Sequence, residues 1–420
     1  MQQSIRTVMT RPVLNWSFAC LILSLHAIPA WPQAGCTDPM ALNFNPLATS
    51  NDGSCLYPPA AFAPNQVAIL PASLEECSGL AMAGGRLWSH EDGGNPEQLH
   101  ALDTLDGSVS LTLTIPGLDN TDWEDAATDE TYLYVGDFGN NAGNRTDLRI
   151  ARILKSDLQN GIPIPEIIHF SFSDQTSFQF GYNAHNFDCE AFFAQDDSLH
   201  LFSKNWTDFK TRHYVLPAQP GTQVAMLRDS FAVQGQVTGA DIRDDGTVVL
   251  LGYNVSTSET FLWLLWDYPG HQFFRGNKRK ISMGSALFTS QPEGIAFSGP
   301  RNGFICSERY SVLPPQLLSF DLTPWLPTPT AVATTGTTRS YWQVHPNPSS
   351  SSFLHVQGPP LQTACMLILE DRFGTRLREW KLDSFPGHCR IDLPAALPAG
   401  IHFLRMIGQH GFVTLRVLII

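Results

Sequence analysis

Short apolar segments bounded by turn-forming residues recur along most of this chain. Between residues 62 and 325, an acidic residue repeatedly opens a short run of small and apolar residues, a turn follows, and a second apolar run ends in polar residues. Such short, turn-bounded runs predict β-strands. The acidic residues are separated by 48, 66, 51 and 52 positions; they are Glu76, Glu124, Glu190, Asp241 and Glu293. Repeats of roughly fifty residues that each hold several strands are typical of β-propeller blades.

Five such repeats predict five blades. The longer interval between the second and third repeats leaves room for a sixth, and an array of β-sandwiches is the competing fold for the same pattern. After a Pro/Thr-rich linker at 326–340, alternating strands continue through 341–420, where six or seven short strands predict a small Ig-like sandwich. The predicted fold class is therefore all-β: a five- or six-bladed β-propeller at 62–325, followed by a C-terminal β-sandwich.

The first residues have the pattern of an export signal. Arg6 and Arg11 precede a short apolar run at 16–25, and small residues follow up to Ala34. This arrangement predicts a signal peptide at 1–34, since the run is too short to span a bilayer. No other segment resembles a transmembrane helix. The sequence Ala-Gly-Cys36 leaves lipidation as an alternative, although Gln33 stands where a lipobox has an apolar residue.

Composition narrows the range of partners. The 420 residues are 43% hydrophobic and 15% charged, with 32 Gly and 30 Pro, which suits packed domains made of many short strands. The net charge of −13 with few basic clusters argues against nucleic acid as a partner.

The cysteines agree with an oxidising compartment. Cys36 and Cys55 close a turn-rich module at 35–58, and Cys365 and Cys389 lie on neighbouring predicted strands, so both pairs are predicted disulfides. Cys20 lies in the signal peptide. Three cysteines remain in the propeller repeats, of which at least one must be unpaired: Cys77, Cys189 and Cys306.

The repeated carboxylates are the candidate chemistry. If each opens the innermost strand of its blade, all five converge at one mouth of the central channel, where crowded carboxylates need a cation or shared protons. Ca²⁺ is the expected ion for oxygen ligands. Polar residues at the ends of the second strands are expected around the same opening; they include His90, Asp92, Asp137, Asn140, Lys204 and Glu308. Three alternatives stay open: carboxylates that tie blades together through backbone N–H groups, a metal site without turnover, and metal-dependent hydrolysis.

Two segments outside the propeller resemble known families. The short module resembles a repeat of secreted bacterial proteins, Gly-Cys-Thr-Asp…Asp-Gly-Ser-Cys, whose Asp and Asn oxygens either bind Ca²⁺ or form Asx turns. The 341–420 segment resembles the type A C-terminal sorting domain of type IX secretion, although a basic residue is more usual than Ile419-Ile420 at the end. Its motif residues are Pro346, Asn347, Pro348, Gly374 and Gly400. This resemblance implies the type IX secretion machinery as a partner, and a cell-surface or secreted location after periplasmic transit.

The propeller itself resembles the SdiA-regulated and esterase-like phytase propellers. Its matching segments are 88–93, 123–125, 136–141 with Arg145, 237–241 and 292–297. In segment 88–93, Glu91 stands where the family is expected to have Asn. Related calcium-dependent propellers include lactonases and phosphoesterases, and the resemblance adds Arg145 to the expected ligand contacts. The predicted function is a surface binding module for a glycan, peptide or small molecule. A metal-dependent esterase, lactonase or phosphoesterase is the alternative, although no Gly-X-Ser-X-Gly, His-Glu-X-X-His or phosphate-loop motif occurs.

Overall fold

The computed structural model of the chain describes residues 33–326 and most of 343–419, with gaps at 348, 350–351, 359–363, 372–375, 395–396 and 409–410. The predicted signal peptide up to residue 32, most of the linker, Pro348 and Gly374 lie outside the described residues. Among the described residues, no helix has the length and apolar character needed to cross a membrane.

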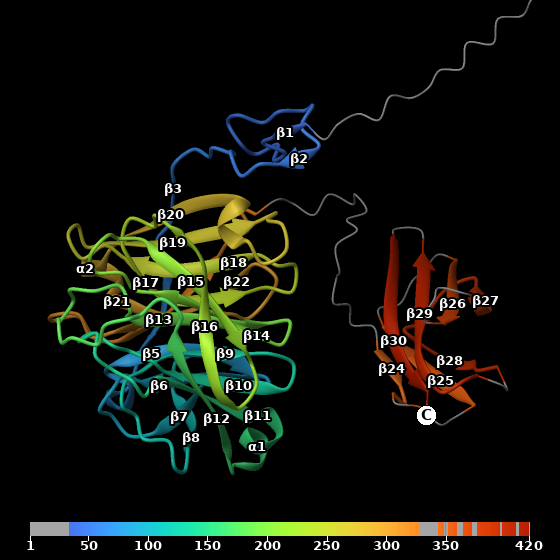
Figure 1. The fold of residues 1–420 in the computed structure, drawn as a ribbon, viewed down its shortest axis with the longest axis horizontal. Helices are drawn as coiled ribbons and strands as arrows, with labels where there is room; N and C mark the ends of the chain where they lie inside the picture. The colour runs from blue at the N-terminus through green and yellow to red at the C-terminus, as the bar shows by residue number, and fades with distance from the viewer. Residues whose placement is uncertain are drawn as a thin grey trace, which may run out of the picture.

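The propeller consists of five blades of four antiparallel strands each, and two of the blades are joined at their outer edges into one eight-stranded sheet. The labelled strands of these blades lie together in Figure 1. Blade 1 contains β5 (Cys77–Ala83), β6 (Arg86–Glu91), β7 (Gln98–Leu102) and β8 (Val109–Thr114). Blade 2 contains β9 (Trp123–Thr128), β10 (Tyr132–Asp137), β11 (Arg149–Leu154) and β12 (Pro165–Phe172). Blade 3 contains β13 (Cys189–Gln195), β14 (Ser198–Ser203), β15 (Thr211–Pro217) and β16 (Gly221–Phe231). Blade 4 contains β17 (Gln236–Ile242), β18 (Val248–Tyr253), β19 (Glu259–Trp266) and β20 (Asn277–Ser285).

Blade 5 is assembled from two distant parts of the chain. It contains β21 (Gln291–Phe297), β22 (Asn302–Glu308), β23 (Gln316–Asp321) and β4 (Asn65–Ile69). Strand β4 precedes blade 1 in the sequence and pairs antiparallel with β23, so hydrogen bonds close the ring. The innermost strands contact one another in a closed cycle, in the order β5, β9, β13, β17, β21 and back to β5.

The structure confirms the propeller and sets its blade count at five. The long interval between the second and third repeats holds α1 (Lys155–Asn160), strand β12 and a loop at 173–188, not another blade. Strand β12 also pairs in parallel with β16, which joins the outer edges of blades 2 and 3. The remaining short elements around the blades are η1 (Ala72–Leu74), η2 (Phe273–Arg275) and α2 (Ala286–Thr289).

Apolar side chains fill the space between adjacent blades. Between blades 2 and 3, Phe138, Phe170 and Phe192 pack edge to face, with ring centroids 5.2 and 6.4 Å apart. A lone four-stranded sheet would leave one such face in water, and burying an aromatic side chain stabilises the fold by about 1.5–3 kcal/mol. Radial packing of repeated sheets therefore explains why the apolar pattern recurs.

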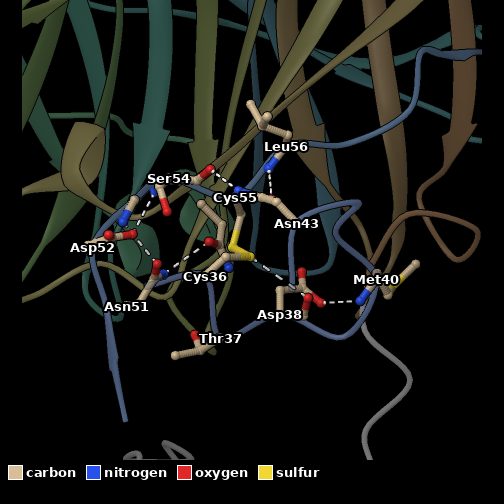
Figure 2. The surroundings of a disulfide bond; sticks show 12 residues. Cys36, Thr37, Asp38, Met40, Asn43, Asn51, Asp52, Ser54, Cys55 and Leu56 are labelled. Atoms are coloured by element: carbon tan, nitrogen blue, oxygen red, sulfur yellow. Dashed lines mark hydrogen bonds between the residues drawn. A yellow bond between two sulfur atoms is a disulfide. The ribbon is translucent and has the colours of Figure 1, made fainter. Parts of the chain in front are cut away.

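The module at 35–58 is held by the predicted Cys36–Cys55 disulfide, which the structure confirms (Figure 2). It has two short strands, β1 (Ala34–Gly35) and β2 (Ser50–Asn51). Side-chain oxygens of its Asp and Asn residues accept backbone N–H bonds at 2.7–3.0 Å; the acceptors are Asp38, Asn43, Asn45 and Asp52. The bonds at Asp38, Asn45 and Asp52 reach the N–H two residues on and form Asx turns, whereas Asn43 accepts the N–H of Leu56 and ties the two ends of the module together.

The module also contacts blade 4. The Asn51 amide donates hydrogen bonds to Asp267 and Asn277, and the ring of Tyr57 lies 5.3 Å from that of Trp266. Strand β3 (Ala60–Ala61) then adds in parallel to the edge of β20. The chain thus crosses the edge of blade 4 before β4 enters blade 5.

The C-terminal segment forms a two-sheet sandwich. One sheet contains β24 (Gln343–His345), β25 (Phe353–Gln357) and β28 (His388–Asp392). The other contains β26 (Cys365–Asp371), β27 (Arg376–Leu382), β29 (Gly400–Gly408) and β30 (Gly411–Ile419). Of the described sorting-motif residues, Asn347 accepts a hydrogen bond from the Leu418 N–H at 2.8 Å, and Gly400 opens β29 with φ of 137°, a conformation that favours glycine.

The second predicted disulfide is not formed in the structure. Cys365 and Cys389 are both free thiols. Their strands, β26 and β28, belong to the two different sheets of the sandwich, and both side chains pack in the core between them.

Candidate functional site

A β-bulge interrupts every innermost strand at the same level of the channel. The extra residue is Glu124 in β9, Glu190 in β13, Thr238 in β17 and Glu293 in β21; in β5 the irregularity spans Ser78 and Gly79. A bulge leaves the extra residue outside the ladder and redirects its side chain. Each blade therefore presents one polar residue at this level.

Three of the five predicted carboxylates come together in this ring. Glu124, Glu190 and Glu293 are each at most 6% exposed. Burial raises the pKa of Glu124 well above its ordinary value, and the Glu190 carboxylate raises it further. Burial likewise raises the pKa of Glu190, with Glu293 adding to the effect against the opposing Lys204 ammonium.

The other two predicted carboxylates lie outside the ring. Glu76 precedes β5, is exposed, and accepts a hydrogen bond from the Asn95 amide at 2.8 Å. Asp241 lies three residues beyond the bulge of β17, where its carboxylate accepts the N–H groups of Ile242 and Phe297 at 2.8 and 2.7 Å. Because Phe297 belongs to β21, Asp241 ties blade 4 to blade 5, as the blade-fastening alternative proposed.

Asp125 joins neighbouring blades in the same way as Asp241, and its side chain is more deeply buried. Its carboxylate accepts N–H groups from Ala126 at 2.8 Å, Phe192 at 3.1 Å and Ala240 at 3.4 Å. These residues lie on the innermost strands of blades 2, 3 and 4. Glu124 is therefore part of the ring of bulged residues, whereas the adjacent Asp125 joins three blades.

Three carboxylates gather tightly beside the ring. Oxygen atoms of Asp92, Asp122 and Glu124 all lie within 4.8 Å of one another. Asp122 immediately precedes β9, Glu124 is the bulged residue of that strand, and Asp92 follows β6 of the neighbouring blade. Burial raises the pKa of Asp122 to about 7, and repulsion from Asp92 and Asp188 contributes. We call Asp92, Asp122 and Glu124 the carboxylate cluster.

Two glycines allow backbone to pass close to the carboxylate cluster. A Cβ at Gly139 would lie 2.0 Å from Glu124 Oε1 and 2.5 Å from Asp122 Oδ2, and one at Gly93 would lie 2.6 Å from Asp122 Oδ1. The donor set is all oxygen and all carboxylate, which is what hard cations such as Ca²⁺ and Mg²⁺ prefer. The residues present therefore fit a divalent cation held by the carboxylate cluster.

Lys204 supplies a positive charge within the ring. It follows β14, and its ammonium is paired with Glu190 at 2.5 Å, both side chains being under 10% exposed. Burial opposes the charge on Lys204, but the Glu190 carboxylate outweighs it and raises the pKa of the ammonium. The ammonium also faces the rings of Trp206 and Tyr253, 5.2 and 5.6 Å from their centroids.

Blade 5 contributes a second acidic pair, Glu293 on β21 and Glu308 on β22. The Gln291 amide donates to Glu293 at 2.6 Å and to Glu308 at 2.5 Å. Burial raises the pKa of Glu293 to about 7 and that of Glu308 to about 8. Repulsion from Glu293 and Asp92 also contributes to the shift at Glu308. These carboxyl groups titrate where general acids and bases operate.

A pocket of about 300 Å³ adjoins the carboxylate cluster and shares Asp122 with it. Its other lining residues are Asn140, Asn141, Ala142, Arg145 and Tyr182. The Arg145 guanidinium is fixed by Gly139 O at 2.8 Å and by Asp137 at 2.9 Å. Polar side chains on rigid supports beside carboxylates form a surface suited to an oxygen-rich ligand.

Three of the five predicted ligand contacts lie at the pocket or in the carboxylate cluster, and two are buried and belong to neither. Asn140 and Arg145 line the pocket, and Asp92 belongs to the carboxylate cluster. Asp137 is fully buried and paired with Arg145 and Arg149, so it supports the pocket from beneath. His90 is fully buried against Trp123, and burial lowers its pKa to about 4, so it is a neutral packing residue.

The sequence analysis did not select Asp122. Asp122 lies in a bend before β9 and Glu124 is bulged, so strand alternation alone does not place their carboxylates together. The repeat search singled out one carboxylate in each unit, and Asp122 fell outside that pattern.

Replacing Gly139 with alanine is expected to abolish the effect of divalent cations on stability while leaving the propeller folded. The new methyl group would occupy the position of the Glu124 and Asp122 oxygens and force them apart. Gly181→Ala is the matched control, because its Cβ meets just the Ala184 methyl at 3.6 Å. Thermal unfolding with and without Ca²⁺ measures both. A normal calcium response in Gly139→Ala would contradict this geometry.

Comparison with known proteins adds little to this description. No family model matches the chain, and no curated protein matches it. A putative gluconolactonase is 12% identical over 60% of this chain and 76% of its own, with a TM-score of 0.34. A gluconolactonase from Xanthomonas campestris is 14% identical over 62% and 97%, with a TM-score of 0.31. The Cps50 (Swd1) β-propeller domain of Myceliophteria_thermophila is 10% identical over 58% and 83%, with a TM-score of 0.30. Likeness at this level says nothing about what the chain binds or catalyses, and the five-bladed fold rests on strand topology.

Proposed function

We propose that this chain is an exported binding protein whose propeller holds a divalent cation, Ca²⁺ first, at one mouth of the central channel. Through that cation it binds an oxygen-rich ligand, such as a glycan, a peptide or a small molecule. The observation that carries the proposal is the carboxylate cluster within 4.8 Å, beside a pocket that shares Asp122.

Electrostatic crowding is the physical reason for the cation. Asp92, Asp122 and Glu124 lie together, and the nearby Lys204 ammonium is already paired with Glu190. Carboxylates at such distances cannot all remain ionised unless a cation or shared protons compensate them. A bound cation would neutralise the cluster and polarise a ligand oxygen. Asn140, Asn141 and Tyr182 would orient the rest of the ligand in the pocket.

Calcium is expected to stabilise the full chain against thermal unfolding after chelation. A ligand that binds the folded state alone adds about 2.7 kcal/mol at a hundredfold excess over Kd. Glu124→Gln, which keeps the size of the side chain but removes its charge, is expected to lose most of this shift. Glu166→Gln serves as control, because Glu166 is an exposed carboxylate on β12 that pairs with Arg152, away from the cluster. No shift with any divalent cation, or an unchanged shift in Glu124→Gln, would refute the proposal.

Hydrolysis of an ester, lactone or phosphoester is the second candidate function. It is favoured by Glu308, whose pKa of about 8 suits a general acid beside a cation site. Under this alternative, Glu308→Gln would abolish turnover of aryl ester, lactone or phosphomonoester substrates while keeping the calcium-dependent stabilisation. Turnover that survives in Glu308→Gln would exclude this role for Glu308.

Export by type IX secretion is part of the proposal and rests on the sequence of the two ends. The 341–420 segment would engage the type IX machinery, and the protein would act at the cell surface or after release. Deletion of 341–420 is expected to retain the protein in the periplasm of its natural host. Normal surface delivery of the truncated chain would contradict this assignment.

A further inference from the structure

Two thiols meet where the ring of blades closes. Cys77 is the first residue of β5 in blade 1, and Cys306 lies on β22 in blade 5. Both are completely buried, and the structure holds both as free thiols. Between blades 5 and 1, strands β5, β21 and β22 are in contact across the closing seam. Neither cysteine takes part in the carboxylate cluster or the pocket.

Gly294 brings the two cysteines together. It faces Cys306 across the ladder of β21 and β22, and a Cβ there would lie 2.8 Å from Cys306 Sγ and 2.6 Å from Ser78 O. Because position 294 has no side chain, Cys306 Sγ can lie 3.7 Å from the carbonyl oxygen of Ser78, which is the residue after Cys77. Cys77 and Cys306 belong to the same buried apolar cluster between blades 1 and 5. They are thus packed at the same seam, although they are 229 positions apart in the sequence.

We propose that Cys77 and Cys306 form a disulfide bond across the seam between blades 1 and 5 when the chain folds in an oxidising compartment. This inference rests on the proposed export, because such bonds persist outside the reducing cytosol. The bond would close the propeller covalently, in addition to the hydrogen bonds of β4. Cross-links that close long loops restrict the unfolded chain most.

The chemistry balances through thiol–disulfide exchange. Two thiols lose two protons and two electrons as the Sγ–Sγ bond forms, and the electrons reduce the disulfide of an oxidoreductase or of oxidised glutathione to two thiols. Exchange requires an accessible thiolate, whereas both sulfur atoms are buried in the closed ring. Oxidation therefore has to precede closure of the seam during folding.

Cys189 provides a matched control. It occupies the first position of β13, as Cys77 does in β5, and it is equally buried. Its Sγ contacts the carbonyl groups of Ala191 and Phe202 at 3.9 and 3.7 Å, within its own blade. Cys189→Ser should therefore leave the cross-link intact, whereas Cys77→Ser and Cys306→Ser should each remove it.

The test is peptide mapping of the full chain without reduction, after refolding in a buffer of reduced and oxidised glutathione. The expected result is a linked pair of peptides containing Cys77 and Cys306, at an occupancy similar to the Cys36–Cys55 pair. Oxidised glutathione added to protein that was folded under reduction should produce the link at least tenfold more slowly. The oxidised wild type should also unfold at a higher temperature than the reduced protein, a comparison that needs no variant to fold.

The outcomes separate this inference from the proposed export. A Cys36–Cys55 link without the Cys77–Cys306 link in refolded protein would overturn the inference, as would a link between Cys77 and Cys189. Both links after refolding, but neither in protein taken from the natural host, would instead contradict export while supporting the geometry.

Discussion

Replacing Asp125 with alanine is expected to lower the free energy of unfolding of the propeller by about 3–6 kcal/mol. The Asp125 carboxylate accepts N–H groups of Ala126, Phe192 and Ala240, which lie on the innermost strands of three blades. Alanine would leave these donors buried without an acceptor, and each costs about 1–3 kcal/mol. Chemical denaturation of the full chain measures the loss.

Asp241→Ala is the comparison for this prediction. Its carboxylate accepts two N–H groups, from Ile242 and Phe297, and joins two blades instead of three. It should therefore cost less than Asp125→Ala. If Asp125→Ala lowered the free energy of unfolding by less than about 1 kcal/mol, water would have to replace the carboxylate as acceptor, and Asp125 would not join the three blades.

Replacing Lys204 with methionine is expected to destabilise the metal-free protein by about 3–5 kcal/mol at pH 8, because Glu190 would remain buried without its partner. The loss should shrink as the pH falls. The folded-state pKa of Glu190 is raised by burial, so the side chain takes up a proton in the folded protein at a pH where the unfolded chain is still ionised. Protonation removes the unpaired charge and with it the penalty.

The double variant Lys204→Met with Glu190→Gln tests the cause. With the charge on Glu190 removed, the double variant should recover most of the stability lost at pH 8. The wild type without cations should also lose stability from pH 5.5 to 8, because Glu293 and Glu308 have folded-state pKa values of about 7 and 8. A pH-independent loss in Lys204→Met would show that packing of the lysine stem, not charge, is responsible.

The five repeats could be predicted from the sequence, with a sixth blade left open, because each innermost strand repeats the same physical problem. A short strand buried between neighbours needs small and apolar residues, and the turn after it contains glycine or aspartate in each blade. The strand that completes blade 5 could not be found in this way. Strand β4 has no acidic opening residue and joins the sheet from the other end of the domain.

The positions facing the channel were harder to predict because the bulges shift the alternation of the strands. Ser78 and Thr238 occupy the places in the ring that the sequence analysis gave to Glu76 and Asp241. A bulge inserts one residue without leaving a mark in the sequence, so a carboxylate near the start of a strand can point to the channel or to a neighbouring blade. Glu124 and Asp125 illustrate both outcomes in adjacent residues.

The pairing of β4 with β23 governs the order in which this domain can be completed. Residues 65–69 enter their sheet once residues 316–321 are present, so about 250 intervening residues must be available before blade 5 is whole. Contacts this distant in sequence slow folding, and a chain made or moved from its N-terminus leaves β4 as an unpaired edge for the whole interval. During that interval the propeller is an open arc, and both ends of that arc expose strand edges without a partner until its last blade arrives.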